Sequence, residues 1–343
     1  MRRLLPLTII TAAVAVFAGL AVARRQRRIA AVAPELRHPQ LMVPMSLRSD
    51  SSLQTGRRLI DALSKQAGKL IADGVDVRTE MVPTDGGDPP VRALVYEPSG
   101  RVGPSAGLLW IHGGGLVMGR PEMNHELCSR IAKELSIVVV SVDYRLAPED
   151  PFPAGLDDCV TTLAWMHEQA DALGLDTGRV AVGGGSAGGG LAACLAQVAT
   201  DRGDLPVRFQ LLQYPMLDDR TPLRDTDALL WTNTSNDYAW TAYLNHPPRE
   251  HEGRPYASAS RRVDFRGLPA AWIGVGDIDL FHDECVDYAE RLEAAGVPVR
   301  FDVVAGMYHG AEAIRPDAPA TAGFIDGMLS ALASGLEVER AVA

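Results

Sequence analysis

A Gly-x-Ser-x-Gly sequence at the junction of a strand-like and a helix-like stretch constrains the fold more than any other feature. Residues 179–182 (RVAV) predict a strand, residues 184–188 (GGSAG) follow, and residues 191–196 (LAACLA) continue as a helix. In a nucleophile elbow, a serine sits on such a sharp strand-to-helix turn with its hydroxyl exposed. Glycines flank the serine because backbone there runs close to backbone. The pattern predicts that Ser186 is a nucleophile on an α/β scaffold.

A second glycine-rich motif lies about seventy residues upstream. The apolar run 108–111 (LLWI) predicts a buried strand that ends at His112, and three glycines, 113–115, follow. The backbone N–H groups of such a loop can hold the oxyanion that forms during acyl transfer. Gly-x-Ser-x-Gly alone is weak evidence, since glycine-rich turns are common in α/β proteins. The two motifs together predict a serine hydrolase.

The rest of the chain alternates strand-like and helix-like stretches from about residue 76 onward. Strands are expected near 77–83, 91–97, 106–111, 136–143, 179–183, 207–214, 270–275 and 299–304, and helices near 123–134, 155–172, 187–201, 283–296 and 319–334. Hairpin-like strands followed by strand–helix alternation predict an α/β fold with a mostly parallel central sheet and helices on both faces.

One long insertion interrupts this alternation. Residues 218–262 lie between two predicted core strands and contain Trp231, Tyr238, Trp240 and Tyr243. Long insertions in compact domains are often active-site lids, so a helical cap is expected here, joined by helices in residues 34–75. The alternative is an aromatic surface excursion with no role. The expected domains are thus residues 1–33, residues 34–75, and a core at 76–337 that carries the insertion.

The charge distribution excludes nucleic acid as a partner of the folded body. Six of the 33 basic residues lie in the first 33 positions, so the rest of the chain carries 27 basic against 43 acidic residues. An acidic body of this kind repels nucleic acid. The four cysteines are widely spaced among apolar neighbours and predict buried free thiols.

The N-terminus predicts a membrane-anchoring helix. No charged residue occurs from Leu4 to Ala23, with arginines on both sides, and twenty helical residues span a hydrocarbon core of about 30 Å. More arginines follow the run than precede it, which favours a cytoplasmic catalytic domain, although the side of the membrane stays open. Residues 21–23 (AVA) resemble a cleavage site, so secretion after signal cleavage is the alternative. A misassigned start and a helix packed on the protein also remain open.

A serine nucleophile needs a base, and the base needs an acid that fixes its tautomer. With a nucleophile elbow, the chain order is serine, acid, histidine. His309 follows the predicted strand 299–304, at the strand end where sheet proteins place functional groups. His282 lies among acidic residues at a helix start, which indicates solvated surface. His309 is therefore the candidate base.

Three acids compete for the third position, all just beyond the predicted strand 271–275. Asp283 is well placed as a helix N-cap, which is a structural role. Asp277 can hold the turn by bonding to nearby backbone. Spacing alone does not separate Asp277 from Asp279.

Four ordered motifs resemble the hormone-sensitive-lipase-like branch of the α/β-hydrolases, which includes arylacetamide deacetylase-like enzymes. They are His112-Gly-Gly-Gly, residues 143–149 (DYRLAPE) with 151–154 (PFPA), residues 184–189 (GGSAGG) and residues 279–284 (DLFHDE). The resemblance covers about residues 76–337. In that family the acid opens an Asp-x-Leu-x-Asp-Glu type stretch, which implies Asp279, with Phe281 where leucine is usual.

The resemblance also implies the oxyanion groups. The N–H groups of Gly113 and Gly114, with that of Ala187 after the nucleophile, are expected to donate to the oxyanion. Gly185 stands where the family commonly has an aspartate that braces this loop, so the local hydrogen bonds are expected to differ. Residues 144–149 predict a structural turn held by an interaction between Arg145 and Glu149.

The expected activity is that of a serine carboxylesterase with no metal or organic cofactor. A capped pocket predicts small-molecule esters with acyl chains up to about eight carbons. An arylacetamide deacetylase or amidase with the same triad is one alternative. A non-catalytic ligand-binding protein on a hydrolase scaffold is another, but such a protein would be expected to lose a triad member. The oligomeric state is not predicted.

Overall fold

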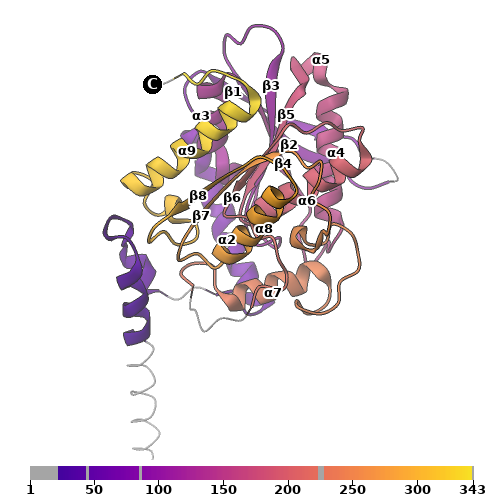
Figure 1. The fold of residues 1–343 in the computed structure, drawn as a ribbon. Coiled ribbons are helices and arrows are strands. Elements are labelled where there is room, and N and C mark those ends of the chain that lie inside the picture. The colour runs from indigo at the N-terminus through magenta and orange to yellow at the C-terminus, as the bar shows by residue number, and fades with distance from the viewer. Residues whose placement is uncertain (1–21, 44–45, 85–86, 223–227, 342–343) are drawn as a thin grey trace, which may run out of the picture.

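An eight-stranded sheet with helices on both faces forms the body of the protein (Figure 1). The computed structural model describes residues 22–43, 46–84, 87–222 and 228–341. The strands are β1 (Val75–Val82), β2 (Val91–Pro98), β3 (Ser105–Ile111), β4 (Val138–Asp143), β5 (Leu175–Gly185), β6 (Phe209–Gln213), β7 (Ala270–Gly276) and β8 (Val299–Val304). The longer helices are α2 (Asp50–Ala67), α3 (His125–Leu135), α4 (Ala154–Glu168), α6 (Ala187–Arg202), α7 (Asn233–Leu244), α8 (His282–Ala294) and α9 (Pro319–Leu336).

The strand order is β1-β2-β4-β3-β5-β6-β7-β8. β2 runs antiparallel to both β1 and β4, and every other neighbouring pair is parallel. The predicted α/β fold with a mostly parallel sheet is confirmed, and each predicted strand and helix is present. Several boundaries differ from the expected ones, such as the start of β5, which lies at Leu175 and not at residue 179. β4 begins two residues later than expected because Ser136 takes φ 53° and ends α3, and the helix expected at 155–172 is split into α4 and the short α5 (Ala170–Leu173).

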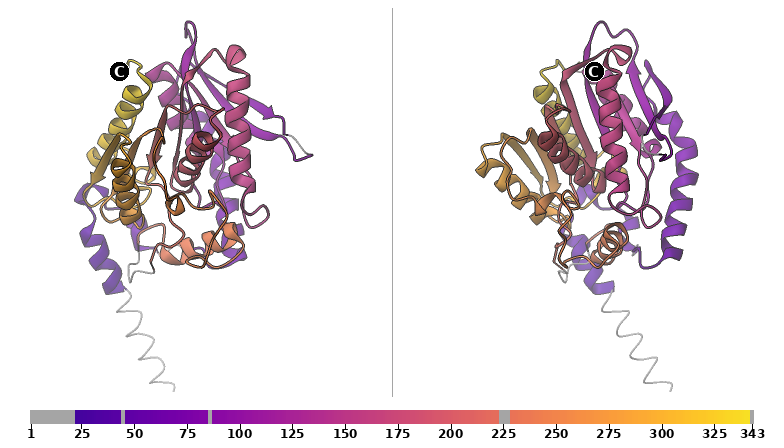
Figure 2. Two further views of the ribbon diagram at one scale, coloured as in Figure 1. Left: turned by 45° about the vertical axis from the view of Figure 1, so that its right-hand side comes forward. Right: turned by 90° about the vertical axis from the view of Figure 1, so that its right-hand side faces the viewer.

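The helices divide between the two faces of the sheet (Figure 2). α3 and α9 lie together on one face, where Arg130 Nη2 is 2.7 Å from Asp326 Oδ1. α4, α6 and α8 cover the other face, and the side-chain amide of Gln197 on α6 donates to the hydroxyl of Tyr288 on α8 at 3.3 Å. Because β3, β5, β6, β7 and β8 are parallel, they all end at the same edge of the sheet, which is where α/β proteins bind ligands.

The segment expected to form a cap follows β6 and precedes β7, and its main helix is α7, seen at the lower end of the molecule in Figure 1. The N-terminal segment contacts this helix. The backbone N–H of Leu47 donates to Ser235 Oγ at 3.0 Å, and the Tyr238 hydroxyl donates to Asp50 Oδ1 at 2.7 Å. These contacts agree with a composite cap, but the division into domains stays a prediction.

The predicted membrane span, Leu4 to Ala23, falls almost wholly outside the described residues. Residues 22–31 are helical, and within the described ranges no helix has both the length and the apolar character needed to cross a bilayer. The prediction of an anchor is therefore not tested by the fold.

The four cysteines are buried free thiols, as the sequence predicts. Burial raises the pKa of the Cys194 thiol to about 12, so this group stays protonated and unreactive at neutral pH.

Candidate active site

Ser186 lies on the turn between β5 and α6, with φ 58° and ψ −120°. A non-glycine residue in this region of φ/ψ space is strained and persists only where the surroundings hold it. The flanking glycines explain how. A Cβ on Gly184 or Gly188 would overlap backbone atoms of the neighbouring turn and of Ile111 at the end of β3. The sequence around Ser186 thus folds into the tight elbow that the glycine spacing predicts.

His309 lies beside Ser186, in the loop after β8. Its Nε2 atom is 2.9 Å from Ser186 Oγ, and its Nδ1 atom is 2.9 Å from Asp279 Oδ2. The serine hydroxyl can donate to Nε2 while the Nδ1–H donates to the buried carboxylate. The other oxygen of Asp279 accepts the backbone N–H of Phe281 at 2.9 Å, which fixes the carboxylate in the loop after β7. The structure therefore brings together Ser186, His309 and Asp279.

Asp277 does not reach the histidine. Its side chain is exposed, and Oδ1 accepts the backbone N–H of Gly306 at 2.6 Å. Asp277 therefore ties the loop after β7 to the loop after β8, whereas the sequence analysis expected a bond within its own turn. The N-cap role expected for Asp283 is wrong: α8 begins one residue earlier, at His282, with Phe281 in the N-cap position. His282 itself is partly exposed, as expected, and its Nδ1 is 2.9 Å from Asp283 Oδ1.

The loop after β3 lies against the nucleophile. A Cβ on Gly113 would lie 2.9 Å from the Gly185 carbonyl oxygen and 3.4 Å from Ser186 Cβ, so only glycine fits this close approach. Gly114 has φ 125°, which L side chains rarely adopt. Among the hydrogen bonds between described residues, none uses the N–H of Gly113 or Gly114. Ala187 is the first residue of α6, where the N–H has no partner within the helix and the helix dipole favours negative charge.

Comparison with known proteins agrees with this geometry. Residues 108–313 match the alpha/beta hydrolase fold family. The chain is 34% identical to esterase LipI of Mycobacterium tuberculosis over 281 residues, which cover 78% of this chain and 84% of LipI. It is 36% identical to the ethyl acetate hydrolase of Pseudomonas putida over 60% of this chain and 65% of that protein.

A solved structure of a bacterial heroin esterase superposes with a TM-score of 0.84 at 37% identity, covering 90% of this chain and 99% of the other. The chain belongs to the α/β-hydrolase family. Within it, these relatives and the four sequence motifs place the protein in the hormone-sensitive-lipase-like esterase branch. The esterase LipW from Mycobacterium marinum is also similar, with a TM-score of 0.82, 32% identity and coverage of 90% of this chain and 96% of that one.

In this α/β-hydrolase, Tyr144 holds the start of the glycine loop, residues 112–115. Its hydroxyl donates to the His112 carbonyl oxygen at 3.0 Å, and its ring stacks on the His112 imidazole with centroids 4.3 Å apart. Burial lowers the pKa of His112, so the imidazole is kept neutral and its Nδ1 lies 2.8 Å from the Gly113 carbonyl oxygen. The sequence analysis missed this role. Tyr144 stood in a recognised motif, but nothing in its spacing indicated what the hydroxyl touches.

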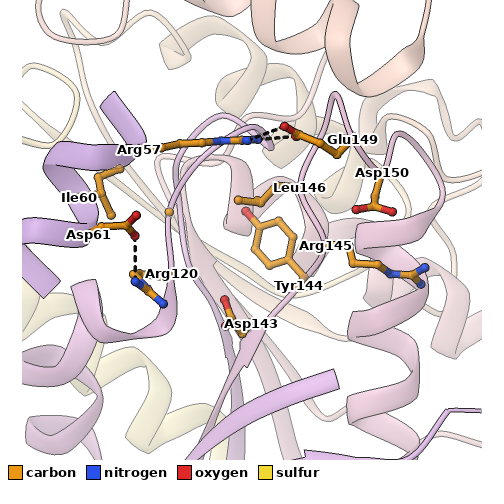
Figure 3. A pocket seen from close by; sticks show the side chains of 11 residues that line it. Arg57, Ile60, Asp61, Arg120, Asp143, Tyr144, Arg145, Leu146, Glu149 and Asp150 are labelled. Atoms are coloured by element: carbon orange, nitrogen blue, oxygen red, sulfur yellow. Dashed lines mark hydrogen bonds and ion pairs between the residues drawn. The ribbon is translucent and has the colours of Figure 1, made fainter. Parts of the chain in front are cut away.

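The expected pairing of Arg145 with Glu149 is wrong (Figure 3). Arg145 instead reaches the buried Asp158 on α4, with Nη2 at 2.8 Å from Oδ1. Glu149 forms a two-pronged ion pair with Arg57 of α2, with both N–O distances 2.8 Å. The hydrogen bonds from Arg57 lower the pKa of Glu149, although burial opposes them. The turn is therefore structural, but its partners come from distant parts of the chain.

Arg57 also connects α2 of the hydrolase to the glycine loop. Its Nε donates to the Val117 carbonyl oxygen at 2.8 Å, and Nη2 donates to the Ala147 carbonyl oxygen at 2.9 Å. On the other side of the loop, Trp231 is buried so close to Gly115 that a Cβ there would overlap the indole. The N-terminal segment and the insertion at 218–262 thus both contact the loop after β3, at Val117 and Gly115 respectively.

Proposed function

We propose that this esterase is a serine carboxylesterase that hydrolyses short- to medium-chain carboxylic esters through an acyl-enzyme. The observation that carries the proposal is the pair of 2.9 Å contacts that run from Asp279 through His309 to Ser186. The N–H groups of Gly113 and Gly114, which no hydrogen bond between described residues uses, support it as well. A nucleophile, a base, an orienting acid and an oxyanion site in this order are the requirements of acyl transfer.

In the proposed mechanism, Ser186 Oγ attacks the ester carbonyl carbon while His309 Nε2 accepts the hydroxyl proton. Asp279 keeps the imidazole in the correct tautomer and stabilises the imidazolium that forms. The N–H groups of Gly113, Gly114 and Ala187 hold the oxyanion. The alcohol leaves with the proton from His309, and water then releases the acid by the same steps in reverse.

The proposed limit on acyl size rests on the apolar and aromatic side chains around a small cavity. It lies beside Ala187 between α6, the glycine loop and α7, and its walls include Leu116, Leu191, Cys194, Trp240 and Tyr243. Its volume is about 10 Å³, which is room for about one water molecule and not for an acyl chain, so the proposed limit rests on its walls and not on its size. An apolar pocket gains about 0.8 kcal/mol for each methylene that it buries, but only until it is full.

A series of p-nitrophenyl esters tests the proposal. We expect kcat/KM to be highest for short and medium acyl chains, up to about eight carbons, and to fall by at least about tenfold by sixteen carbons. Ser186→Ala, measured alongside, subtracts hydrolysis that does not use the proposed nucleophile. A profile that keeps climbing to sixteen carbons, or a jump in activity at a lipid–water interface, would contradict the size limit. A p-nitroanilide arm with turnover above that of the ester would favour an amidase instead.

We also propose that residues 4–23 anchor the enzyme in a membrane by one helix. The support is the uncharged run with arginines at both ends. Full-length protein is expected in the membrane fraction after extraction with alkaline carbonate. Recovery in the soluble fraction with an intact N-terminus would contradict the anchor. Recovery outside the cell with a new N-terminus near residue 24 would instead indicate a cleaved signal.

A further inference from the structure

The carboxyl group of Glu312 is enclosed next to the catalytic residues, and the proposed mechanism does not use it. Glu312 lies in the short turn η6 (Ala311–Ala313), just after His309. Its Oε1 accepts hydrogen bonds from the Tyr214 hydroxyl and, at 3.3 Å, from the side-chain amide of Gln213. Its Oε2 is shut off from solvent, with no hydrogen-bond partner among the described residues. An enclosed carboxyl with half of its bonding capacity unused is costly, which calls for a role.

Tyr214, the first partner of Glu312, packs directly against the proposed base. Its ring meets the His309 imidazole edge-on, with centroids 4.6 Å apart at an angle of 63°. Phe281 contacts the imidazole as well, at 5.1 Å and 88°. Tyr214 has φ 34°, a strained value for a tyrosine, so other contacts must hold it there. The hydrogen bond to Glu312 is one such contact.

Gln213, the second partner, connects the same carboxyl to the nucleophile. Its backbone carbonyl accepts the N–H of Ser186 at 2.9 Å, and its side-chain amide donates to Glu312. Glu312 therefore binds two consecutive residues at the end of β6. One of them holds the backbone of the nucleophile, and the other packs on the imidazole of the base.

We infer that Glu312 is a positioning residue, which sets the His309 imidazole relative to Ser186 by holding Tyr214 and Gln213. This inference rests on the proposed function. The distance between Nε2 and the serine hydroxyl depends on where the imidazole lies, and a displacement of about 1 Å can cost on the order of 100-fold in rate. Glu312 touches neither substrate nor reacting atoms, so it acts only through its two partners.

The charges around Glu312 agree with this placement. Burial raises the pKa of the Glu312 carboxyl, and Asp279 acts in the same direction, whereas the hydrogen bond from Tyr214 and the charge of a protonated His309 lower it. The carboxyl raises the pKa of Tyr214, together with burial as the larger cause, so the tyrosine stays a hydroxyl donor at neutral pH. Tyr308 is a further titratable group within its electrostatic reach.

Steady-state kinetics with p-nitrophenyl butyrate on Glu312→Ala, Tyr214→Phe and the double variant test the inference. Glu312→Ala leaves a buried hydroxyl and a buried amide without their acceptor, so kcat is expected to fall about 30-fold with KM within about twofold of wild type. Tyr214→Phe keeps the ring but loses the bond, and kcat is expected to fall about tenfold. Because both changes break one link, the double variant should be no worse than about twofold below Glu312→Ala.

Glu312→Gln is the conservative rescue, since its amide oxygen still accepts from Tyr214; it should keep at least about a third of the wild-type kcat. Glu284→Gln is the matched control. Glu284 is also a buried carboxyl, which accepts the Leu217 N–H at 2.6 Å, but among the described residues no hydrogen bond, ion pair or ring contact joins it to His309. This control should leave kcat within about twofold of wild type, whatever it does to stability.

Any one of four results overturns the inference. The first two are a kcat of Glu312→Ala within about twofold of wild type, and an effect of Glu312→Ala that multiplies with that of Tyr214→Phe. The other two are a Glu312→Gln variant as impaired as Glu312→Ala, and a loss of kcat in Glu284→Gln as large as that in Glu312→Ala. If Glu312→Ala does not fold, Tyr214→Phe and Glu312→Gln decide: a wild-type kcat in Tyr214→Phe overturns it. Ser186→Ala separates the two claims, because activity that survives in that variant contradicts the proposed function and not the role of Glu312.

Discussion

Replacing Ser186 with alanine is expected to lower kcat for p-nitrophenyl acetate by about 10⁴-fold or more. The change removes the hydroxyl that lies 2.9 Å from His309 Nε2, so the base loses the group from which it would take a proton. His309→Ala should cost about as much, because a serine hydroxyl without a base is a poor nucleophile. Residues that act as one unit lose most of their effect with the first removal, so the double variant should be hardly slower than either single one.

Folding is the control for these two variants. Circular dichroism and thermal unfolding should show an intact protein, since each change removes only one side chain from a large core. Alanine has the same Cβ as serine, so the change at Ser186 adds no strain to its φ and ψ angles. Turnover above about a tenth of wild type in either variant would show that the nucleophile or the base lies elsewhere.

Asp279→Asn should lower kcat by about 10³-fold or more while leaving KM close to wild type. The carboxylate is buried and accepts the Nδ1–H of His309 at 2.9 Å, so an amide there can present its NH₂ to the ring, favour the wrong tautomer and remove the charge that stabilises the imidazolium. Asp277→Asn is the matched comparison two residues away. Its amide oxygen can still accept the Gly306 N–H, so we expect less than about a fivefold loss.

The ranking of these two variants is the test. Both variants should be assayed under the same conditions, because only Asp279→Asn leaves the imidazolium that forms on His309 without its carboxylate partner. The opposite ranking would transfer the role of the acid to Asp277 and contradict the proposed triad.

The sequence predicts those parts of the site where geometry tolerates one residue type. Gly184 and Gly188 leave no room for a Cβ beside backbone, and Gly113 packs on Ser186, so the two glycine motifs together indicate where Ser186 lies. The strand and helix pattern predicts the fold for a similar reason, since a parallel strand that is buried on both sides, such as β3, is apolar along most of its length. The residue pattern alone does not identify the acid, because Asp277 and Asp279 follow the same strand. Only the resemblance to a family favours Asp279.

Contacts between distant segments could not be predicted in this way. Arg57, Tyr144 and Glu312 each act through a partner that only the folded chain brings near, and no local spacing indicates that partner, even for Tyr144 within its recognised motif. The error over Arg145 and Glu149 has the same origin. The spacing of four residues between opposite charges predicted an ion pair, but Arg145 instead pairs with the buried Asp158, thirteen positions away. Local spacing carries no information about such competitors.

The loop that carries His309 is fastened to the beginning of the chain, and this bears on proteolytic maturation. Ala33 donates its N–H to the Gly306 carbonyl oxygen at 3.1 Å, and the Tyr308 hydroxyl donates to the Leu36 carbonyl oxygen at 3.2 Å. Val32 is only 1% exposed. A protease that cuts after Ala23 leaves these contacts whole, whereas a cut after Ala33 removes Val32 and one of the two hydrogen bonds that flank the base. A form of the enzyme that keeps Val32 and both hydrogen bonds beside His309 therefore starts no later than Val32.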